Sequence, residues 1–168
     1  MKMTELFLGE LEREAKPTRR TLEQVPDGLI DWRPHPRSMP LGYLATLVAT
    51  LPSWIALMVN QPELDLRPVD REPFRPPTRS TAAEYVAALD ESVQQARQAL
   101  SATTDEHLLT HWQLKAAGHV VTDQPRHIFI RDAVFNHLAH HRGQLTVYLR
   151  LNEAKVPSIY GPTADEPM

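Results

Sequence analysis

The stretch NHLAHHRGQLTVYLRLN, residues 136–152, has three histidines within five positions. His137 and His141 are four residues apart, which on a helix places them about 40° apart around the axis and one turn along it. The apolar residues that continue this stripe are Ile130, Val134, Leu145 and Tyr148. The spacing predicts a helix that begins after Pro125, ends near Asn152 and turns both imidazoles toward an apolar interior.

Prolines mark the interruptions in the rest of the chain. The sequence has 15 of them, where average usage would give about eight, and they cluster at 26–40, 62–77 and 157–167. Residues 78–124 contain none. Because proline breaks helices and is common in connections, this distribution predicts a few long helices joined by loops, the longest being the proline-rich segment 61–79.

Apolar spacing predicts one helix over about residues 4–24 and a second over about residues 39–60. The second is expected to begin after Ser38, a good N-cap, with Pro40 in the first turn. Pro52 should kink it, since proline removes a backbone hydrogen bond and crowds the preceding turn. This second helix is apolar on most of its circumference, which favours burial on two sides.

A third helix is predicted from the capping box formed by Thr81 and Glu84, and its apolar residues continue in heptad spacing to Leu100. Between it and the last helix, residues 111–125 contain alternating and β-branched residues around a glycine, which favours a short hairpin or an extended loop. The fold class expected is therefore all-α, a four-helix bundle, with residues 1–168 as a single domain.

Composition narrows the classes of function. The net charge of −3 offers no positive excess for a phosphate backbone, so we expect no nucleic-acid partner. The chain has no cysteine, so any metal must be bound by His, Asp or Glu. Residues 38–62 lack charge, but polar residues and Pro52 interrupt them, and we expect no membrane span. Acidic residues near the N-terminus argue against a signal peptide and favour a cytoplasmic protein.

The spacing of His137 and His141 suits a two-nitrogen metal clamp on one helix. His140 is about 60° from His137 in the opposite sense, which is typical of an outer or surface residue. The pair is only half of a site, because zinc usually takes three protein ligands or more. Two core histidines satisfied by hydrogen bonds would have the same spacing. Leu138 stands where a zincin protease needs glutamate, so proteolysis is not supported.

The closing segment, residues 137–152 followed by VPSIYGPTADE, closely resembles the last helix and tail of the DinB-like superfamily of metal-dependent bacterial proteins. Residues 41–55, LGYLATLVATLPSWI, resemble its second helix. The resemblance implies a four-helix bundle of up-down-down-up topology, often a homodimer, in which three histidines hold nickel or zinc. It also implies thiol-dependent transfer chemistry that uses a low-molecular-weight thiol.

The implied metal triad is incomplete here. His137 and His141 match the paired ligands, but the histidine expected on the second helix falls on Leu47, which cannot coordinate metal. Two imidazoles plus water could still hold nickel or copper, and a substitute ligand could come from elsewhere. The candidate substitutes are His107, His111, His119 and His127. Gln144 is a candidate hydrogen-bond partner of a ligating histidine, Arg142 is expected in a surface ion pair, and Tyr148 could line the pocket or belong to the core.

Two functions remain open. The first is a divalent-metal-dependent enzyme of the thiol-dependent transferase type, acting on a small-molecule substrate. The alternative is a non-enzymatic dimeric bundle in which Leu47 has turned the metal site into a pocket for a small apolar ligand. The second helix also leaves Tyr43, Leu47, Trp54 and Leu57 on a flanking surface, which a homodimer would cover.

Overall fold

The computed structural model describes residues 1–69, 77 and 79–167, so residues 70–76 and 78 of the expected proline-rich loop lie outside the described residues. The helices are α1 (Met3–Leu22), α2 (Leu41–Thr50), α3 (Trp54–Asn60), α4 (Ala82–Ala102), α5 (Asp105–Leu109), α6 (Arg126–Phe129) and α7 (His137–Leu151). A 3-10 turn, η1 (Leu51–Ser53), joins α2 to α3, and a π-helix, η2 (Ile130–Asn136), joins α6 to α7.

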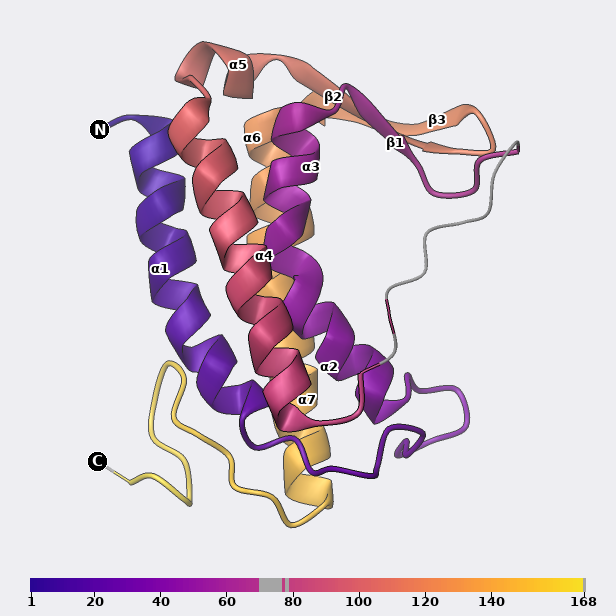
Figure 1. The fold of residues 1–168 in the computed structure, drawn as a ribbon, viewed down its shortest axis with the longest axis vertical. Helices are drawn as coiled ribbons and strands as arrows, with labels where there is room; N and C mark the ends of the chain where they lie inside the picture. The colour runs from indigo at the N-terminus through magenta and orange to yellow at the C-terminus, as the bar shows by residue number, and fades with distance from the viewer. Residues whose placement is uncertain (70–76, 78, 168) are drawn as a thin grey trace.

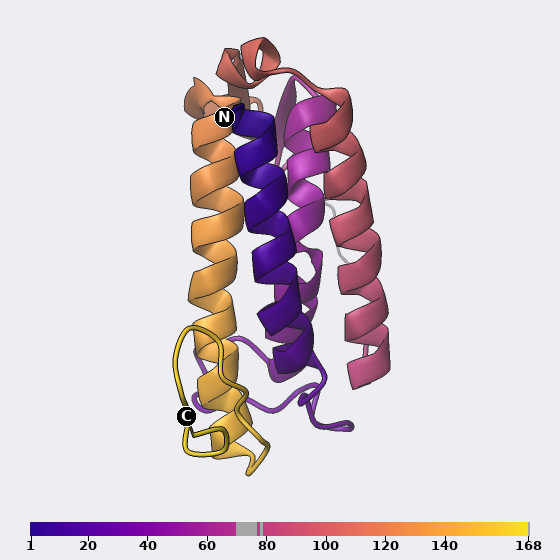
Figure 2. The same cartoon turned by 90° about the vertical axis from the view of Figure 1, so that its left-hand side faces the viewer.

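The long helices lie side by side along the long axis of the molecule (Figure 1). Helix α4 packs against α1 and against the α2–α3 segment, while α7 packs against α2 and α1. Turning the molecule shows α1 beside the rod formed by α6, η2 and α7, with the C-terminal tail folded over the lower end of α7 (Figure 2). The helices enclose one apolar core to which all of them contribute.

Helix α2 begins at Leu41, not directly after Ser38 as predicted, and Pro40 occupies the N-cap position without a side-chain cap. Proline restricts the residue before it to extended backbone, so the helix cannot start at Met39. The first backbone N–H groups of α2 donate instead to loop carbonyls, Leu41 to Trp32 at 2.8 Å and Gly42 to Ile30 at 2.9 Å. A Cβ at Gly42 would lie 3.0 Å from the Ile30 Cβ, tighter than ordinary van der Waals contact, so this close approach favours glycine.

The expected effect of Pro52 is confirmed, because η1 interrupts the helix at this proline and separates α2 from α3. The combined segment Leu41–Asn60 is long and apolar enough to cross a membrane, but 61% of its most apolar window is buried inside the fold. A buried core helix passes the same test of length and composition, so the segment is weak evidence for a membrane span. Its burial follows from its place between α4 and α7.

The histidine-bearing helix follows Pro125 and ends at Leu151, close to the predicted bounds. The predicted stripe is buried at Ile130, Val134, Leu145 and Tyr148. The turns before His137 form a π-helix, which the apolar spacing does not predict. Short π segments inside helices often occur at functional sites.

The fold is mostly helical, as predicted, but it is not all-α, because a small three-stranded sheet projects from one end of the helices (Figure 1). The predicted hairpin is present as β2 (His111–Ala116) and β3 (His119–Pro125), and β1 (Glu63–Asp65) pairs with β2 in parallel. Ala117 and Gly118, both with positive φ, form the turn. The Asp65 carboxylate accepts hydrogen bonds from the backbone N–H groups of these two residues, which ties β1 to the hairpin.

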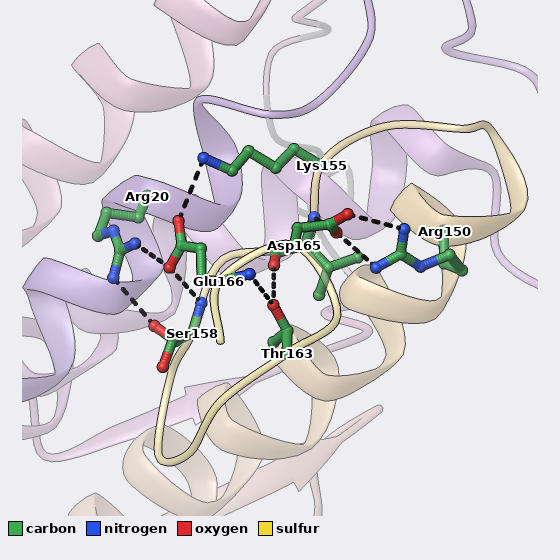
Figure 3. Close-up of polar contacts among 8 residues, drawn as sticks. Arg20, Arg150, Lys155, Ser158, Thr163, Asp165 and Glu166 are labelled. Atoms are coloured by element: carbon green, nitrogen blue, oxygen red, sulfur yellow. Dashed lines mark hydrogen bonds and ion pairs between the residues drawn. The ribbon is translucent and has the colours of Figure 1, made fainter. Parts of the chain in front are cut away.

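The capping box that starts α4 is confirmed, since the Thr81 hydroxyl accepts from the Glu84 backbone and the Glu84 carboxylate accepts from Thr81. At the other end of the chain, the tail after α7 folds back on itself and is held by two acidic residues (Figure 3). Asp165 pairs with Arg150 of α7 at 2.5 Å, and Glu166 pairs with Arg20 of α1. The tail therefore bridges the first and last long helices.

Candidate metal centre

His137 and His141 lie at the start of α7 on the side that faces the α2–α3 segment. Their Nε2 atoms are 2.7 Å apart and their ring centroids are 4.5 Å apart. His141 is buried, with 5% of its surface exposed, and His137 is half-buried. Trp54 of α3 contacts the His137 ring edge to face, with centroids 5.8 Å apart. The helix thus brings together the two imidazoles that the spacing predicts.

The Nδ1 atom of each ring faces an oxygen. His141 Nδ1 lies 2.8 Å from Gln144 Oε1, and His137 Nδ1 lies 3.3 Å from the backbone carbonyl of Ala133 in the π-helix. A carbonyl oxygen can only accept, so each ring bonds its oxygen when it carries its proton on Nδ1, whereas a hydrogen bond between the two Nε2 atoms requires a proton on one of them. When both protons are on Nδ1, the two Nε2 lone pairs converge on one point, which is what two ligands of a single ion require.

Burial disfavours protonation of both rings. Loss of hydration lowers the pKa of His137 and of His141 below the ordinary histidine value, and the neighbouring His140 lowers both further. The bond to Gln144 acts in the opposite direction at His141, as the bond to the Ala133 carbonyl does at His137. Neutral imidazole is the form that binds metal, so the surroundings favour the competent state.

Gln144 connects His141 to His140. The Gln144 amide oxygen faces His141 Nδ1, and the amide nitrogen lies 3.1 Å from His140 Nε2. His140 and Gln144 are both exposed, and the His140 ring stands edge to face against His141 with centroids 4.9 Å apart. These two residues therefore form the solvent side of the pair, next to the predicted ligands.

Tyr148 and Leu47 belong to the surrounding framework. The Tyr148 ring is 9% exposed and packs edge to face on Trp32, with centroids 5.5 Å apart, while its hydroxyl donates to the carbonyl of Met39 at 3.2 Å. The structure thus gives Tyr148 a complete set of core contacts. Leu47 is partly buried and packs against the hydrophobic core.

The four substitute histidines lie in α5, in the hairpin and in α6, and their interactions are with other groups. His107 Nε2 bonds the Val59 carbonyl at 2.9 Å, and His127 Nδ1 bonds the Leu108 carbonyl at 3.2 Å. His111 pairs with Asp123 at 2.7 Å, and His119 is exposed on β3. Within the described part of the chain, no three His, Asp or Glu side chains are grouped to hold a metal ion.

The two imidazole nitrogens have the chemistry and the spacing to act together as two ligands of one zinc, nickel or copper ion. Metal–nitrogen bonds of about 2.0–2.1 Å would separate two neighbouring nitrogens by roughly 2.9–3.4 Å, so a small ring rotation from the observed 2.7 Å suffices. Each ring also has an oxygen partner on its far nitrogen, the usual device for fixing a ligating imidazole. The remaining coordination positions would have to be filled by water or by a substrate atom.

The prediction that Arg142 forms a surface ion pair is wrong. Arg142 is buried, with 1% of its surface exposed. It pairs with Glu14 of α1 at 2.6 Å, donates to Thr18 at 2.9 Å and bonds the hydroxyl of Tyr160 in the tail. Its position on the helix explains the burial, because Arg142 lies beside the apolar row Leu138, Leu145 and Leu149. That neighbourhood is visible in the sequence and could have identified Arg142 as an interior residue.

Comparisons with known proteins agree on one family. The family model of the DinB superfamily matches residues 10–145. A DinB-like protein from Bacillus cereus is 25% identical, with a TM-score of 0.69 over 92% of this chain and 95% of that one. A DinB-like protein from Bacillus subtilis, 16% identical, shares the fold with a TM-score of 0.67 over 91% and 95% of the two chains. No curated protein matches. The chain belongs to the DinB superfamily.

Proposed function

We propose that this protein is a divalent-metal-dependent enzyme of the thiol-dependent transferase type, with His137 and His141 as its metal ligands. The observation that carries the proposal is the convergence of two Nε2 atoms, 2.7 Å apart, on rings whose Nδ1 atoms both face oxygens. With both protons on Nδ1, the two Nε2 lone pairs stay at this distance only with a cation between them, whereas a proton on one Nε2 would give a hydrogen bond between neutral rings. Burial lowers the pKa of both rings and so favours the neutral form, which is the form that binds metal.

Nickel and zinc are the ions that the resemblance implies, and both accept imidazole nitrogen. A bound ion lowers the pKa of a coordinated thiol or water and makes it a nucleophile near neutral pH. The chain has no cysteine, so a thiol must come from a low-molecular-weight cofactor. The protein's own residues hold the ligands: Gln144 orients His141, the Ala133 carbonyl orients His137, and Trp54 limits the movement of the His137 ring.

Metal content measured by mass spectrometry tests this proposal, on protein purified without a histidine tag. We expect near-stoichiometric nickel or zinc in the wild type and its loss in both His137→Ala and His141→Ala. A matched control is His119→Ala, which removes an exposed histidine from the hairpin and should leave the metal content unchanged. A wild type that takes up no ion even when incubated with excess nickel, zinc or copper would overturn the proposal.

The second candidate is a non-enzymatic bundle that binds a small apolar ligand. Leu47 favours it, because an apolar, partly buried side chain stands where the resemblance expects a ligand, and no third ligand is grouped with the pair in the described residues. A thermal-shift screen with small apolar compounds tests it. Stabilisation that persists in His137→Ala and in the presence of a chelator would favour this function over metal chemistry.

We also infer the up-down-down-up bundle topology and a homodimer. The packing of α4 against both α1 and the α2–α3 segment supports the topology. For the dimer, Tyr43 is exposed, and Leu47, Trp54 and Leu57 are half-buried on one side of α2 and α3. Leu57→Glu should lower the mass measured by light scattering from that of two chains to that of one, whereas an unchanged mass would place the interface elsewhere.

A further inference from the structure

The rod formed by α6, η2 and α7 buries different faces before and after the π-helix. Successive residues of an α-helix lie about 100° apart around the axis. In a regular α-helix, the buried face of α6 and η2 would continue onto α7 with its centre close to His137. The buried face of α7 is instead centred close to Leu145, about 80° further around the axis. The buried residues are Arg126, Phe129, Ile130, Val134 and Phe135 in the first part, and Leu138, His141, Arg142, Leu145, Tyr148 and Leu149 in the second.

The π-helix η2 accounts for this rotation of the buried face. Its hydrogen bonds join residues i and i+5 instead of i and i+4, so it takes about one residue more into a turn. One additional residue changes the phase of the side chains by about 100°, which is close to the difference between the two faces. Both parts of the rod can therefore pack their buried side chains against the same core.

The rotation decides where His137 and Arg142 lie. Arg142 is turned into the core, whereas His137 lies at the edge of the buried face, half-buried beside the exposed His140 and Gln144. Without the rotation, His137 would lie at the centre of the buried face and Arg142 outside it. A metal ion and a substrate can reach the His137–His141 pair because His137 lies at this edge.

The end of η2 also changes the backbone bonding of His137. In an α-helix, the His137 N–H would donate to the carbonyl of Ala133, four residues earlier. It donates instead to the carbonyl of Val134, and the Ala133 oxygen lies 3.3 Å from Nδ1 of the His137 ring. Trp54 of α3 contacts the same ring, with centroids 5.8 Å apart. The ring is therefore in contact both with a backbone oxygen of the π-helix and with an indole of a neighbouring helix.

We propose that the π-helix η2 positions His137 for metal binding. The residue that η2 takes up beyond the α-helical number rotates α7 until the His137 ring lies at the edge of the core, against the Ala133 oxygen and Trp54. The inference rests on the proposed function for the ion, whereas the place of the His137 ring is a property of the metal-free protein.

Deletion of Asp132 tests the role of the additional residue. Asp132 is exposed in the middle of η2, and its carboxylate accepts a hydrogen bond from the exposed Asn136. A rod one residue shorter should be α-helical throughout with both buried faces in place, so the variant should fold with a urea midpoint close to that of the wild type. Asp132→Ala is the matched control, because it removes the bond to Asn136 and keeps the π-helix. Deletion of Gly143, which is exposed in α7, should unfold the protein, because it turns Leu145 and the residues after it about 100° out of the core.

The first measurement is made on metal-free protein in a chelator. It is the nuclear Overhauser effect between the His137 ring and the Trp54 indole. We expect a strong effect in the wild type and in Asp132→Ala, and a weaker one after deletion of Asp132, because the Ala133 carbonyl should then accept from the His137 backbone and no longer hold the ring. An Asp132 deletion that does not fold, or that keeps the wild-type Overhauser effect, would overturn the proposal.

The second measurement is the affinity for nickel, by titration of the same proteins. Loss of the outer partner of a ligating histidine weakens binding about 10- to 100-fold, so we expect binding about tenfold weaker after deletion of Asp132 and unchanged in Asp132→Ala. A folded deletion variant that binds nickel as tightly as the wild type would also overturn the proposal. A wild type that shows the expected Overhauser effect but binds no nickel would contradict the proposed function and leave the placement of the His137 ring by η2 standing.

Discussion

His141 and Arg142 are neighbours in the chain and both are buried, yet their polar atoms meet very different surroundings. Arg142 turns toward α1, where its guanidinium contacts the Glu14 carboxylate, the Glu14 carbonyl and the Thr18 hydroxyl, and it also bonds Tyr160 from the tail. His141 lies beside His137, whose ring contacts Trp54 of α3, and the Nε2 atom of His141 lies 2.7 Å from the Nε2 atom of His137.

The difference separates structural from functional polar groups. A buried charge that finds a carboxylate and neutral acceptors within its own protein is complete, and its removal leaves those partners unsatisfied. A buried nitrogen that faces another nitrogen of the same kind is completed only by a proton or an ion. We therefore assign the Arg142 cluster to stability and the His137–His141 pair to ligand binding, and the variants below test this division.

The largest effect is expected from Arg142→Met. Methionine keeps much of the apolar volume but removes the cation, so the Glu14 carboxylate loses its ion-pair partner and keeps the bond from the Tyr160 hydroxyl, and Thr18 loses a donor, in a nearly closed site. Breaking a buried ion pair in this way costs about 3 kcal/mol or more. The measurement is the free energy of unfolding in urea.

Arg150→Met is the matched control for that experiment. Arg150 lies on the same helix and also pairs with a carboxylate, Asp165, but its side chain is 48% exposed. Exposed pairs contribute at most about 1 kcal/mol, so this variant should lose much less stability. Equal losses in the two variants would show that burial does not distinguish the two arginines.

Leu47→His tests the assignment of the His137–His141 pair to ligand binding, because it adds the third imidazole that the family pattern expects. If the pair is an incomplete site, a further nitrogen should raise nickel affinity at least about tenfold, equivalent to roughly 1.4 kcal/mol. Isothermal titration of both proteins measures the change. An unchanged affinity would mean that residue 47 does not face the pair, or that another residue already completes the site.

The sequence predicted much of the helical fold, because helix stripes, capping boxes and prolines are local signals. The stripe of the last helix, the Thr81 cap of α4 and the break at Pro52 all followed from spacing of a few residues. The paired histidines followed from the same spacing. Each of these features involves residues within about one turn of a helix, and the spacing of those residues in the sequence is enough to predict which of them share a face.

Features that depend on distant segments were missed. Strand β1 pairs with β2, and its Asp65 bonds the turn at Ala117 and Gly118, in both cases with segments about 50 residues away in the chain. The start of α2 depends on carbonyls of the preceding loop, and the buried ion pair of Arg142 depends on Glu14, 128 residues distant. The π-helix places the Ala133 carbonyl beside the His137 ring. This contact depends on the backbone conformation, which the pattern of side chains does not predict.

His141→Leu should change stability by less than about 1 kcal/mol, despite the burial of the residue. Leucine is apolar and of similar size, and the Gln144 amide that loses its partner is exposed to water. Replacing a hydrogen-bonding group by an apolar group of similar shape changes the free energy of unfolding little when no buried polar atom is left without a partner. The measurement is urea unfolding with a chelator present. A loss as large as that of Arg142→Met would mean that the histidine pair is itself a structural element.

Acid should release the tail before it affects the core, and this is the smallest effect expected. The pKa of Asp165 is lowered, mainly by the bond from Arg150, and that of Glu166 is lowered, mainly by the backbone N–H of Ser158. Each carboxylate therefore stabilises the folded tail fully above its ordinary pKa, and this contribution is lost as the pH falls through the lowered value. Amide signals of Val156 and Ser158, which donate to these carboxylates, report the release.

A titration from neutral pH to about pH 3 should shift the Val156 and Ser158 signals while the amides of Ala96 and Leu100, buried near the end of α4 away from the Glu84 cap, keep their positions. The Arg142 cluster should survive this release in part, because Glu14 and Thr18 belong to α1 and only Tyr160 belongs to the tail. Loss of the α4 and tail signals at the same pH would contradict this order. It would mean that the tail, through Tyr160, is as necessary to the buried arginine as the carboxylate of Glu14.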